Sequence, residues 1–177
     1  MAATQLVFAI FCFGIAGSLR MPDRNLLDIR SRIIETAAKE VGVREKTGHN
    51  DGKAIAEYLR SVGLNRPEPY CAAFVCWVFQ KEGMSKPRSG WSPDLFPQSR
   101  LARSALPGNI IGIYFPQIER IAHVGLIEKV DGSWISTIEA NTNVSGSREG
   151  DGVYRKKRHI RTIYHMADWI EKGRALR

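Results

Sequence analysis

One cysteine stands where a protein backbone can make it reactive. Cys71 follows Pro69 and Tyr70 and opens an apolar segment that is expected to form a buried helix. A thiol at a helix N-terminus lies near the positive end of the helix dipole and near unpaired backbone N–H groups, and both favour the thiolate. The same N–H groups can stabilise an oxyanion beside the sulfur. Cys71 is therefore a candidate nucleophile; the alternative is a small, inert, buried side chain.

A nucleophilic cysteine needs a base, and the chain contains four histidines. His49 lies in a polar loop, and His159 and His165 lie in the basic C-terminal part. His123 differs from them because it stands near the start of an otherwise apolar segment, 122–127, that is expected to be a strand. We expect His123 to be the base that serves the cysteine. The alternative is a core histidine whose hydrogen bonds are satisfied.

Two polar residues end the next expected strand. Glu139 and Asn141 are two positions apart, so both side chains point to one face of a sheet. A carboxylate or an amide at this place would hold the imidazole in its productive tautomer. The sequence leaves open which of the two does so. Alternatively, Glu139 is a solvated strand end and Asn141 belongs to a turn.

The register of this hairpin tests whether the histidine and the carboxylate meet. The chain is expected to turn within residues 130–133. A two-residue Asp-Gly loop would put His123 opposite Ala140, so that His123 and Glu139 face opposite sides of the sheet. An odd-length loop, with Gly132 in the left-handed conformation, would put His123 opposite Glu139. We therefore predict the odd register, or a β-bulge with the same effect.

The elements that position these residues follow from the hydrophobic pattern. Apolar residues first recur at helical spacing and then at strand spacing, which predicts one α+β domain. A long loop rich in proline and serine, 83–108, separates the two halves and contains Trp91. The expected helices cover residues 29–41, 53–62 and 71–82, and the expected strands cover 110–115, 122–130, 133–138, 153–158 and 160–164.

Length and charge limit the class of protein. A chain of 177 residues fits one domain, and the formal net charge of +8 favours polyanionic surfaces. No zinc-finger spacing, RNP-like segment or arginine-rich helix is present, so we expect no nucleic-acid partner. Cys71 and Cys76 are five residues apart on one expected helix and point away from each other, which rules out a disulfide between them. The pair also lacks metal-ligand spacing, and Cys76 is expected to be a buried apolar side chain.

The N-terminus differs from the rest of the chain. Residues 1–19 carry no charged side chain, and residues 6–16 are almost wholly apolar. This run is short for a membrane span and suits a signal or membrane-anchoring peptide over residues 1–18, although the usual basic start is missing. The alternative is an apolar strand or helix packed on the domain. The catalytic domain is then expected over residues 19–177.

The order of the motifs resembles the CHAP family, the cysteine- and histidine-dependent amidohydrolases and peptidases. Residues 69–77 are similar to the nucleophile motif of that family, and residues 122–125 and 137–142 are similar to its histidine and Glu-x-Asn blocks. The likeness runs over residues 35–164 and also includes the segments 47–52 and 146–154. It implies a papain-like fold, with the cysteine helix packed on an antiparallel sheet, and peptidoglycan stem or bridge peptide as substrate.

The sequence departs from this family at two positions: Tyr70 stands where many relatives have tryptophan, and Cys76 where serine is common. Some relatives bind calcium through several aspartates shortly before the nucleophile. This chain has only Glu68 there, so we expect no metal and no cofactor. Tyr70 and Trp91 are expected to line the substrate cleft, with a buried packing role as the alternative for Trp91.

The sequence thus predicts a cysteine amidohydrolase or endopeptidase that cleaves peptidoglycan peptide through a thioester. Cys71 is the expected nucleophile, His123 the base, and Glu139 or Asn141 the residue that orients it. We expect a monomer that is periplasmic or secreted and meets a membrane only through its N-terminal segment; a cytoplasmic location stays open. The alternatives are another amide substrate, such as a glutathione–polyamine conjugate, or an inactive wall-binding module. Which amide bond is cut is also left open.

Overall fold

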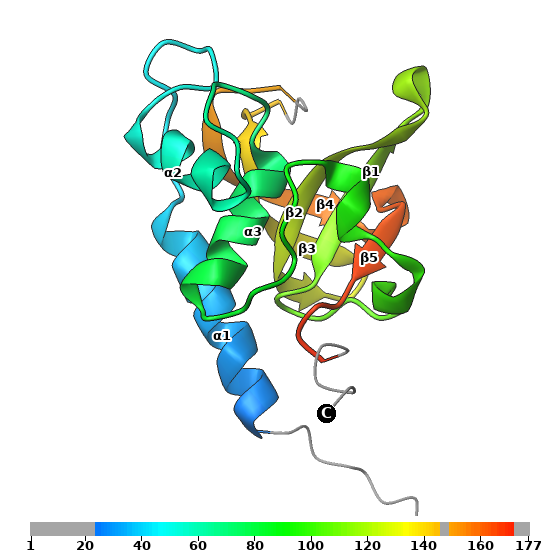
Figure 1. Cartoon of the computed structure of the whole chain (residues 1–177). Helices are drawn as coiled ribbons and strands as arrows, with labels where there is room; N and C mark the ends of the chain where they lie inside the picture. Colours follow the sequence, from blue (N-terminus) through cyan, green and yellow to red (C-terminus); the bar gives the residue numbers. More distant parts are fainter. Residues whose placement is uncertain (1–23, 146–148, 172–177) are drawn as a thin grey trace, which may run out of the picture.

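The computed structural model describes residues 24–145 and 149–171, so the predicted signal segment 1–18 lies outside the described residues. Within them, three α-helices precede a five-stranded antiparallel sheet with the strand order β4-β3-β2-β1-β5 (Figure 1). The predicted α+β class is confirmed. The elements are α1 (Arg24–Lys39), α2 (Lys53–Ser61), α3 (Cys71–Lys81), β1 (Ile110–Phe115), β2 (Arg120–Asp131), β3 (Trp134–Thr142), β4 (Gly152–His159) and β5 (His165–Ala167).

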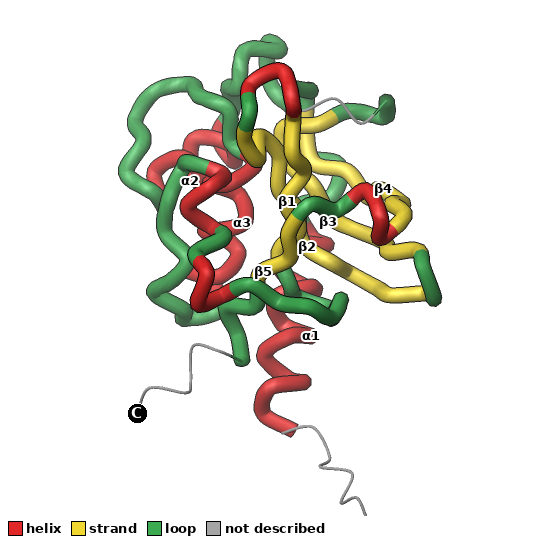
Figure 2. The backbone as a smooth tube through the Cα atoms, turned by 90° about the vertical axis from the view of Figure 1, so that its right-hand side faces the viewer, coloured by secondary structure: helices red, strands yellow, loops and turns green. Residues whose placement is uncertain are grey.

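The helix α3 forms the centre of the helical layer. Its residues 71–79 are all buried, as its nearly continuous apolar sequence predicts. Figures 1 and 2 both show the helices gathered on one side of the sheet. The main core joins α3, through residues such as Phe74, to Val124 and Leu126 of β2 and Ile138 of β3. Burial of each such side chain contributes about 1.5–3 kcal/mol, so the start of α3 is held against the sheet by ordinary core packing.

The β2–β3 hairpin turns through a two-residue loop. Asp131 pairs with Trp134, which leaves Gly132 and Ser133 in the loop, with Gly132 in the left-handed conformation at φ 56°. The predicted odd-length loop was therefore wrong. The register then shifts between Ile127 and Lys129, where one extra residue of β2 forms a β-bulge. The prediction had allowed for a bulge with the same effect as an odd loop, and this part is confirmed.

The bulge decides which side chains share a face. Beyond it, Leu126 pairs with Ile138, and counting onward places Gly125 opposite Glu139. His123 is two residues from Gly125, so the histidine and Glu139 project from the same face of the sheet. They are offset diagonally by two residues, and the predicted direct pairing of His123 with Glu139 was wrong.

The C-terminal part differs from its prediction. Residues expected as a strand over 160–164 begin with a short 3-10 helix, Ile160–Thr162, and the strand β5 follows it. The side chain of His159 accepts a hydrogen bond of 3.2 Å from the backbone of Arg161 and so caps the 3-10 turn. The chain then crosses to the far edge of the sheet, where β5 pairs with β1.

A buried ion pair holds the chain after β5. Arg30 of α1 contacts Asp168 at 2.5 Å, and both side chains are less than a tenth exposed. Arg30 also donates to the side chain of Asn109 at 3.0 Å and to the backbone of Pro107 at 2.9 Å. These contacts join the first helix to the last strand.

None of the helices within the described ranges combines the length and the apolar character that crossing a membrane requires.

Candidate active site

Cys71 is the first residue of α3, as predicted, and it is 4% exposed. The residue that precedes the helix, Tyr70, gives the first turn no side-chain hydrogen bond, so no capping side chain occupies the N–H groups beside the sulfur. The Sγ atom lies 3.6 Å from the hydroxyl oxygen of Ser92, which comes from a 3-10 turn in the loop 83–108. The structure thus surrounds the thiol with hydrogen-bond donors.

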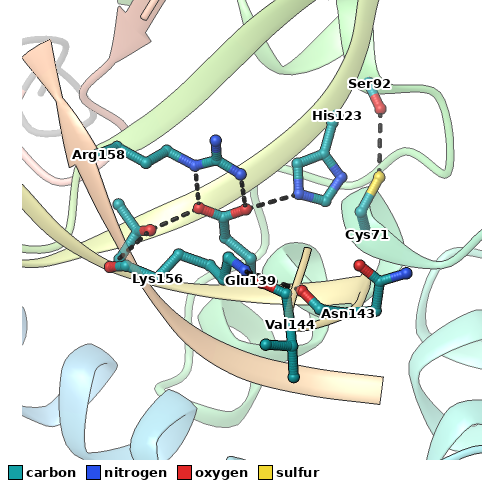
Figure 3. Close-up of polar contacts among 9 residues, drawn as sticks. Cys71, Ser92, His123, Glu139, Asn143, Val144, Lys156 and Arg158 are labelled. Carbon is teal, nitrogen blue, oxygen red and sulfur yellow. Dashed lines mark hydrogen bonds and ion pairs between the residues drawn. The ribbon is translucent and has the colours of Figure 1, made fainter. Parts of the chain in front are cut away.

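The imidazole of His123 lies between the thiol and a carboxylate. Its Nε2 atom is 2.8 Å from Oε2 of Glu139, and the side chain is 1% exposed. Figure 3 shows the other ring nitrogen facing the sulfur of Cys71. When Nε2 carries the proton that Glu139 accepts, Nδ1 is the atom available to exchange a proton with the thiol.

Glu139 is itself held by three further hydrogen bonds from two residues. Its carboxylate accepts two hydrogen bonds of 2.5 Å from Arg158, one on each oxygen, and one of 2.5 Å from the hydroxyl of Thr137. Figure 3 shows the guanidinium and the imidazole on different sides of this carboxylate. A two-pronged arginine contact fixes the plane of a carboxylate as well as its charge. The position of the carboxylate next to the imidazole is therefore set by β3 and β4 together.

A glycine makes room for this carboxylate. Gly125 lies opposite Glu139, and a Cβ atom added to it would stand 2.4 Å from Cγ of Glu139 and 3.0 Å from the backbone oxygen of Ile138. Such distances are well inside van der Waals contact. Any side chain at residue 125 would push Glu139 away from the imidazole. Steric exclusion therefore explains why the segment 122–125 ends in glycine.

The acidities of the three groups favour an ion pair. Burial raises the pKa of the Cys71 thiol, but the neighbouring imidazole of His123 outweighs burial, so this pKa lies below its ordinary value of 9.0. Burial lowers the pKa of His123, yet Cys71 and Glu139 raise it from 6.5 to about 9. Burial raises the pKa of Glu139, but Arg158 and His123 lower it from 4.5 to about 2. Thiolate, imidazolium, carboxylate and guanidinium then sum to zero charge, as buried charges require.

The second cysteine of α3 has the opposite character. The sulfur of Cys76 contacts the backbone of Ser89, at 3.4 Å from the nitrogen and 3.3 Å from the oxygen. Burial raises the pKa of Cys76 to about 11. Both cysteines are free, as the predicted lack of a disulfide between them requires. Two thiols five residues apart on one helix thus differ in acidity because His123 outweighs the effect of burial at Cys71, whereas burial dominates at Cys76.

The structure places Asn141 at the end of β3 in the left-handed conformation, at φ 57°, with 1% of its side chain exposed. Asparagine adopts this conformation more readily than most residues. The Nε2–H group of His123 donates its hydrogen bond to the carboxylate of Glu139.

One of the two residues predicted to line the cleft does not lie there. Tyr70 is 0% exposed and packs against the ring of Tyr58, because the residue before α3 turns its side chain into the core; its expected place in the cleft was wrong. Trp91 is 50% exposed and lines a cleft of about 440 Å³ next to Cys71, so the alternative of a buried Trp91 is wrong. The cleft is lined by Leu64, Glu68, Pro69, Cys71, Ser89, Gly90, Trp91, Ser92, Arg120 and Ala122.

Three polar residues of this region are not predicted by the sequence. Arg158 holds Glu139, Ser92 contacts Cys71, and Arg120 lines the cleft. Alternation along β4 puts Arg158 on the face of Glu139 once the β3–β4 register is known, but the long connection between these strands hides that register. No pattern in the sequence marks the other two as neighbours of the thiol.

Across 24–145 and 149–171, no group of three or more histidine, cysteine, aspartate or glutamate side chains is arranged to bind a metal ion. Glu68, the one acidic residue close before the nucleophile, contacts Arg66 at 2.7 Å. The expectation of a metal-free site stays a prediction.

Comparison with known proteins gives weak likenesses only. No known family model matches the chain, and no curated protein matches it. A crystal structure of the NlpC/p60 domain of peptidoglycan hydrolase SagA aligns with a TM-score of 0.45 at 14% identity, over 78% of this chain and 97% of that one. The crystal structure of Ly7917 aligns with a TM-score of 0.46 at 15% identity, over 77% of this chain and 60% of that one. These TM-scores lie below 0.5, and the resemblance to the CHAP family stays a prediction.

Proposed function

We propose that this chain is a cysteine amidohydrolase that cleaves an amide bond in peptidoglycan peptide through a thioester intermediate. One observation carries the proposal: a thiol at the start of a buried helix faces an imidazole whose other nitrogen contacts a buried carboxylate. This is the arrangement that nucleophilic catalysis by cysteine requires. A module that only binds the wall would have no use for a thiol of lowered pKa held beside a histidine.

The reaction begins with proton transfer within the pair. His123 holds the proton of Cys71, and the thiolate attacks the carbonyl carbon of the substrate amide. The imidazolium then protonates the leaving amine as the C–N bond breaks, which leaves a thioester on the sulfur. His123 next takes a proton from water, which attacks the thioester and restores the thiol. Glu139 keeps the ring in place and stabilises its charged form.

The charge that develops on the carbonyl oxygen needs hydrogen-bond donors. The first-turn N–H groups of α3 lie beside the sulfur, and no side chain caps them. The hydroxyl oxygen of Ser92 lies 3.6 Å from the sulfur, and this hydroxyl can serve as a further donor. Donors that are in place before the reaction stabilise an oxyanion without reorganising, and removal of one such donor typically costs about 100-fold to 1,000-fold in kcat.

The choice of substrate rests on the sequence. The ordered motifs around Cys71, His123 and Glu139 resemble those of CHAP enzymes, which act on wall peptides. The net charge of +8 suits an acidic envelope polymer. Secretion and action as a monomer belong to the same proposal, and the fragments released from peptidoglycan identify the amide bond.

The first experiment compares three versions of the full chain on purified peptidoglycan. They are the natural protein, Cys71→Ala, and Cys76→Ala as a matched control from the same helix. Mass spectrometry of the released fragments identifies the new ends and so names the bond. We expect release by the natural protein and by Cys76→Ala, and none by Cys71→Ala, with all three showing the same circular dichroism spectrum.

Two results would count against the proposal in different ways. Release that persists in Cys71→Ala would remove the cysteine mechanism. Absence of release by a natural protein whose Cys71 is readily alkylated at neutral pH would keep the reactive thiol but contradict peptidoglycan as substrate. Amides outside the wall, such as glutathione–polyamine conjugates, would then be assayed with the same three proteins.

A further inference from the structure

An arginine lines the cleft beside the candidate nucleophile. Arg120 is the first residue of β2 and borders the same cleft of about 440 Å³ as Cys71 and Trp91. Its guanidinium carbon lies 3.9 Å from the centre of the Trp91 ring, and one of its nitrogens donates to the backbone oxygen of Ile121 at 3.2 Å. Stacking on an aromatic face restricts a long, flexible side chain to few conformations. The guanidinium is thus held at the wall of the cleft.

No carboxylate among the described residues neutralises the charge of this guanidinium. Among the residues that the structure describes, Arg120 forms no ion pair; its polar contacts are the Trp91 ring and one backbone oxygen. The cleft has one acidic lining residue, Glu68, and this residue contacts Arg66 at 2.7 Å. An arginine has five N–H donors in a planar fork, so most of the donors of Arg120 remain available to a ligand.

We propose that Arg120 binds a carboxylate of the substrate close to the amide that Cys71 attacks. This inference rests on the proposed function and narrows the substrate to peptides with a free carboxylate beside the scissile bond. A planar fork matches the two oxygens of a carboxylate, and Trp91 prepares the fork for that contact. The residue binds and selects the substrate, whereas the sulfur and the imidazole carry out the chemistry.

The test uses two synthetic peptides that contain the bond identified in peptidoglycan. They differ only at the residue next to the bond, which has a free carboxylate in one peptide and a carboxamide in the other. The natural full chain is compared with Arg120→Gln and Arg120→Lys. Arg103→Gln is the control, because Arg103 is an exposed arginine outside this cleft.

We expect the natural protein to favour the carboxylate peptide in kcat/KM by about tenfold to a hundredfold, the usual range for one charge-assisted contact. Arg120→Gln abolishes this preference by slowing the carboxylate peptide, and it changes the carboxamide peptide little. Arg120→Lys retains part of the preference, since it keeps the charge and loses the fork. Arg103→Gln behaves as the natural protein. A loss of equal size on both peptides in Arg120→Gln would overturn the inference.

A binding measurement separates this inference from the proposed function. Calorimetric titration of Cys71→Ala with each peptide measures affinity when no cleavage takes place. Tighter binding of the carboxylate peptide that disappears in the Cys71→Ala, Arg120→Gln double variant supports the role of Arg120, even if the natural protein hydrolyses neither peptide. Equal affinity for the two peptides in Cys71→Ala would overturn that role, whatever the fate of the hydrolase proposal.

Discussion

Replacement of Glu139 by glutamine tests how the carboxylate acts on the thiol. Glutamine has nearly the same shape and lacks the charge, so the change alters the electrostatics of the ring more than its packing. In the natural protein the pKa of His123 is raised to about 9, in part by Glu139, and the pKa of Cys71 is lowered mainly by His123. We expect Glu139→Gln to weaken the thiolate–imidazolium pair and to move thiolate formation to higher pH.

The size of the effect follows from the contact. The carboxylate oxygen lies 2.8 Å from Nε2 of His123, and both side chains are almost completely buried. A neighbouring opposite charge at such a distance raises the pKa of a base by about 1–3 units, which corresponds to about 1.4–4 kcal/mol. Loss of this term reduces the ion pair at neutral pH and lowers kcat/KM by about tenfold to a thousandfold.

The rate of alkylation by iodoacetamide, measured from pH 4 to pH 10, reports the thiolate directly and needs no substrate. Cys12 is replaced by serine in every protein, and Cys76 contributes little near neutral pH because its pKa is about 11. The natural profile should show a thiol that becomes reactive below pH 9, because the pKa of Cys71 is lowered. The acid limb of the profile should move to higher pH in Glu139→Gln.

Arg158→Gln provides the contrasting variant. It removes the guanidinium that neutralises Glu139, leaves the carboxylate charged and so keeps the pKa of His123 raised, provided that the ring contact persists. We expect its acid limb to stay near that of the natural protein. An unchanged profile in Glu139→Gln would refute the electrostatic role of the carboxylate. Equal shifts in both variants would show that Glu139 acts only by holding the ring in place.

Two further predictions concern packing. Gly125→Ala should displace Glu139, since the added Cβ would stand 2.4 Å from its Cγ, and we expect kcat/KM to fall at least tenfold and the free energy of unfolding to fall by about 1–3 kcal/mol. Gly132→Ala is the control, because residue 132 lies in open space at φ 56°. This change should lower the free energy of unfolding by about 1–2 kcal/mol and leave activity unchanged. Asp168→Ala should lower the free energy of unfolding by about 3–5 kcal/mol in urea titrations, because it leaves Arg30 buried without its carboxylate. Equal activity losses in the two glycine variants, or an unchanged urea midpoint for Asp168→Ala, would contradict these explanations.

Local patterns in the sequence were sufficient to place the thiol and the helices. Cys71 opens α3 as predicted, because a continuous apolar run after two prolines marks both the helix and its start. His123 is indicated in the same way, as the one polar side chain of the apolar segment 122–127. Such signals are local, and they survive folding because burial of the apolar residues fixes the elements that carry them.

Contacts between distant segments could not be read in this way. The shared face of His123 and Glu139 depends on a bulge near Glu128, and the sequence allowed an odd loop equally well. Arg158 reaches the carboxylate only through the β3–β4 register, which follows a long connection. Tyr70 has a polarity that suits a cleft, but its side chain, at the residue before α3, points into the core. The sequence does not determine that direction.

The two halves of the site rest on different kinds of structure. Arg158, Glu139 and His123 come from three adjacent strands, and Cys71 from the helix packed on them, so backbone hydrogen bonds and core packing fix the reacting groups relative to one another. The wall of the cleft that contains Trp91 belongs to the loop 83–108, whose regular structure consists of short 3-10 turns. Rigid elements give the precision that proton transfer needs. Loops vary in sequence at small cost to the fold, so the contacts that Trp91 makes with the substrate can change, whereas Arg120 lies at the start of β2 and stays with the chemistry on the sheet.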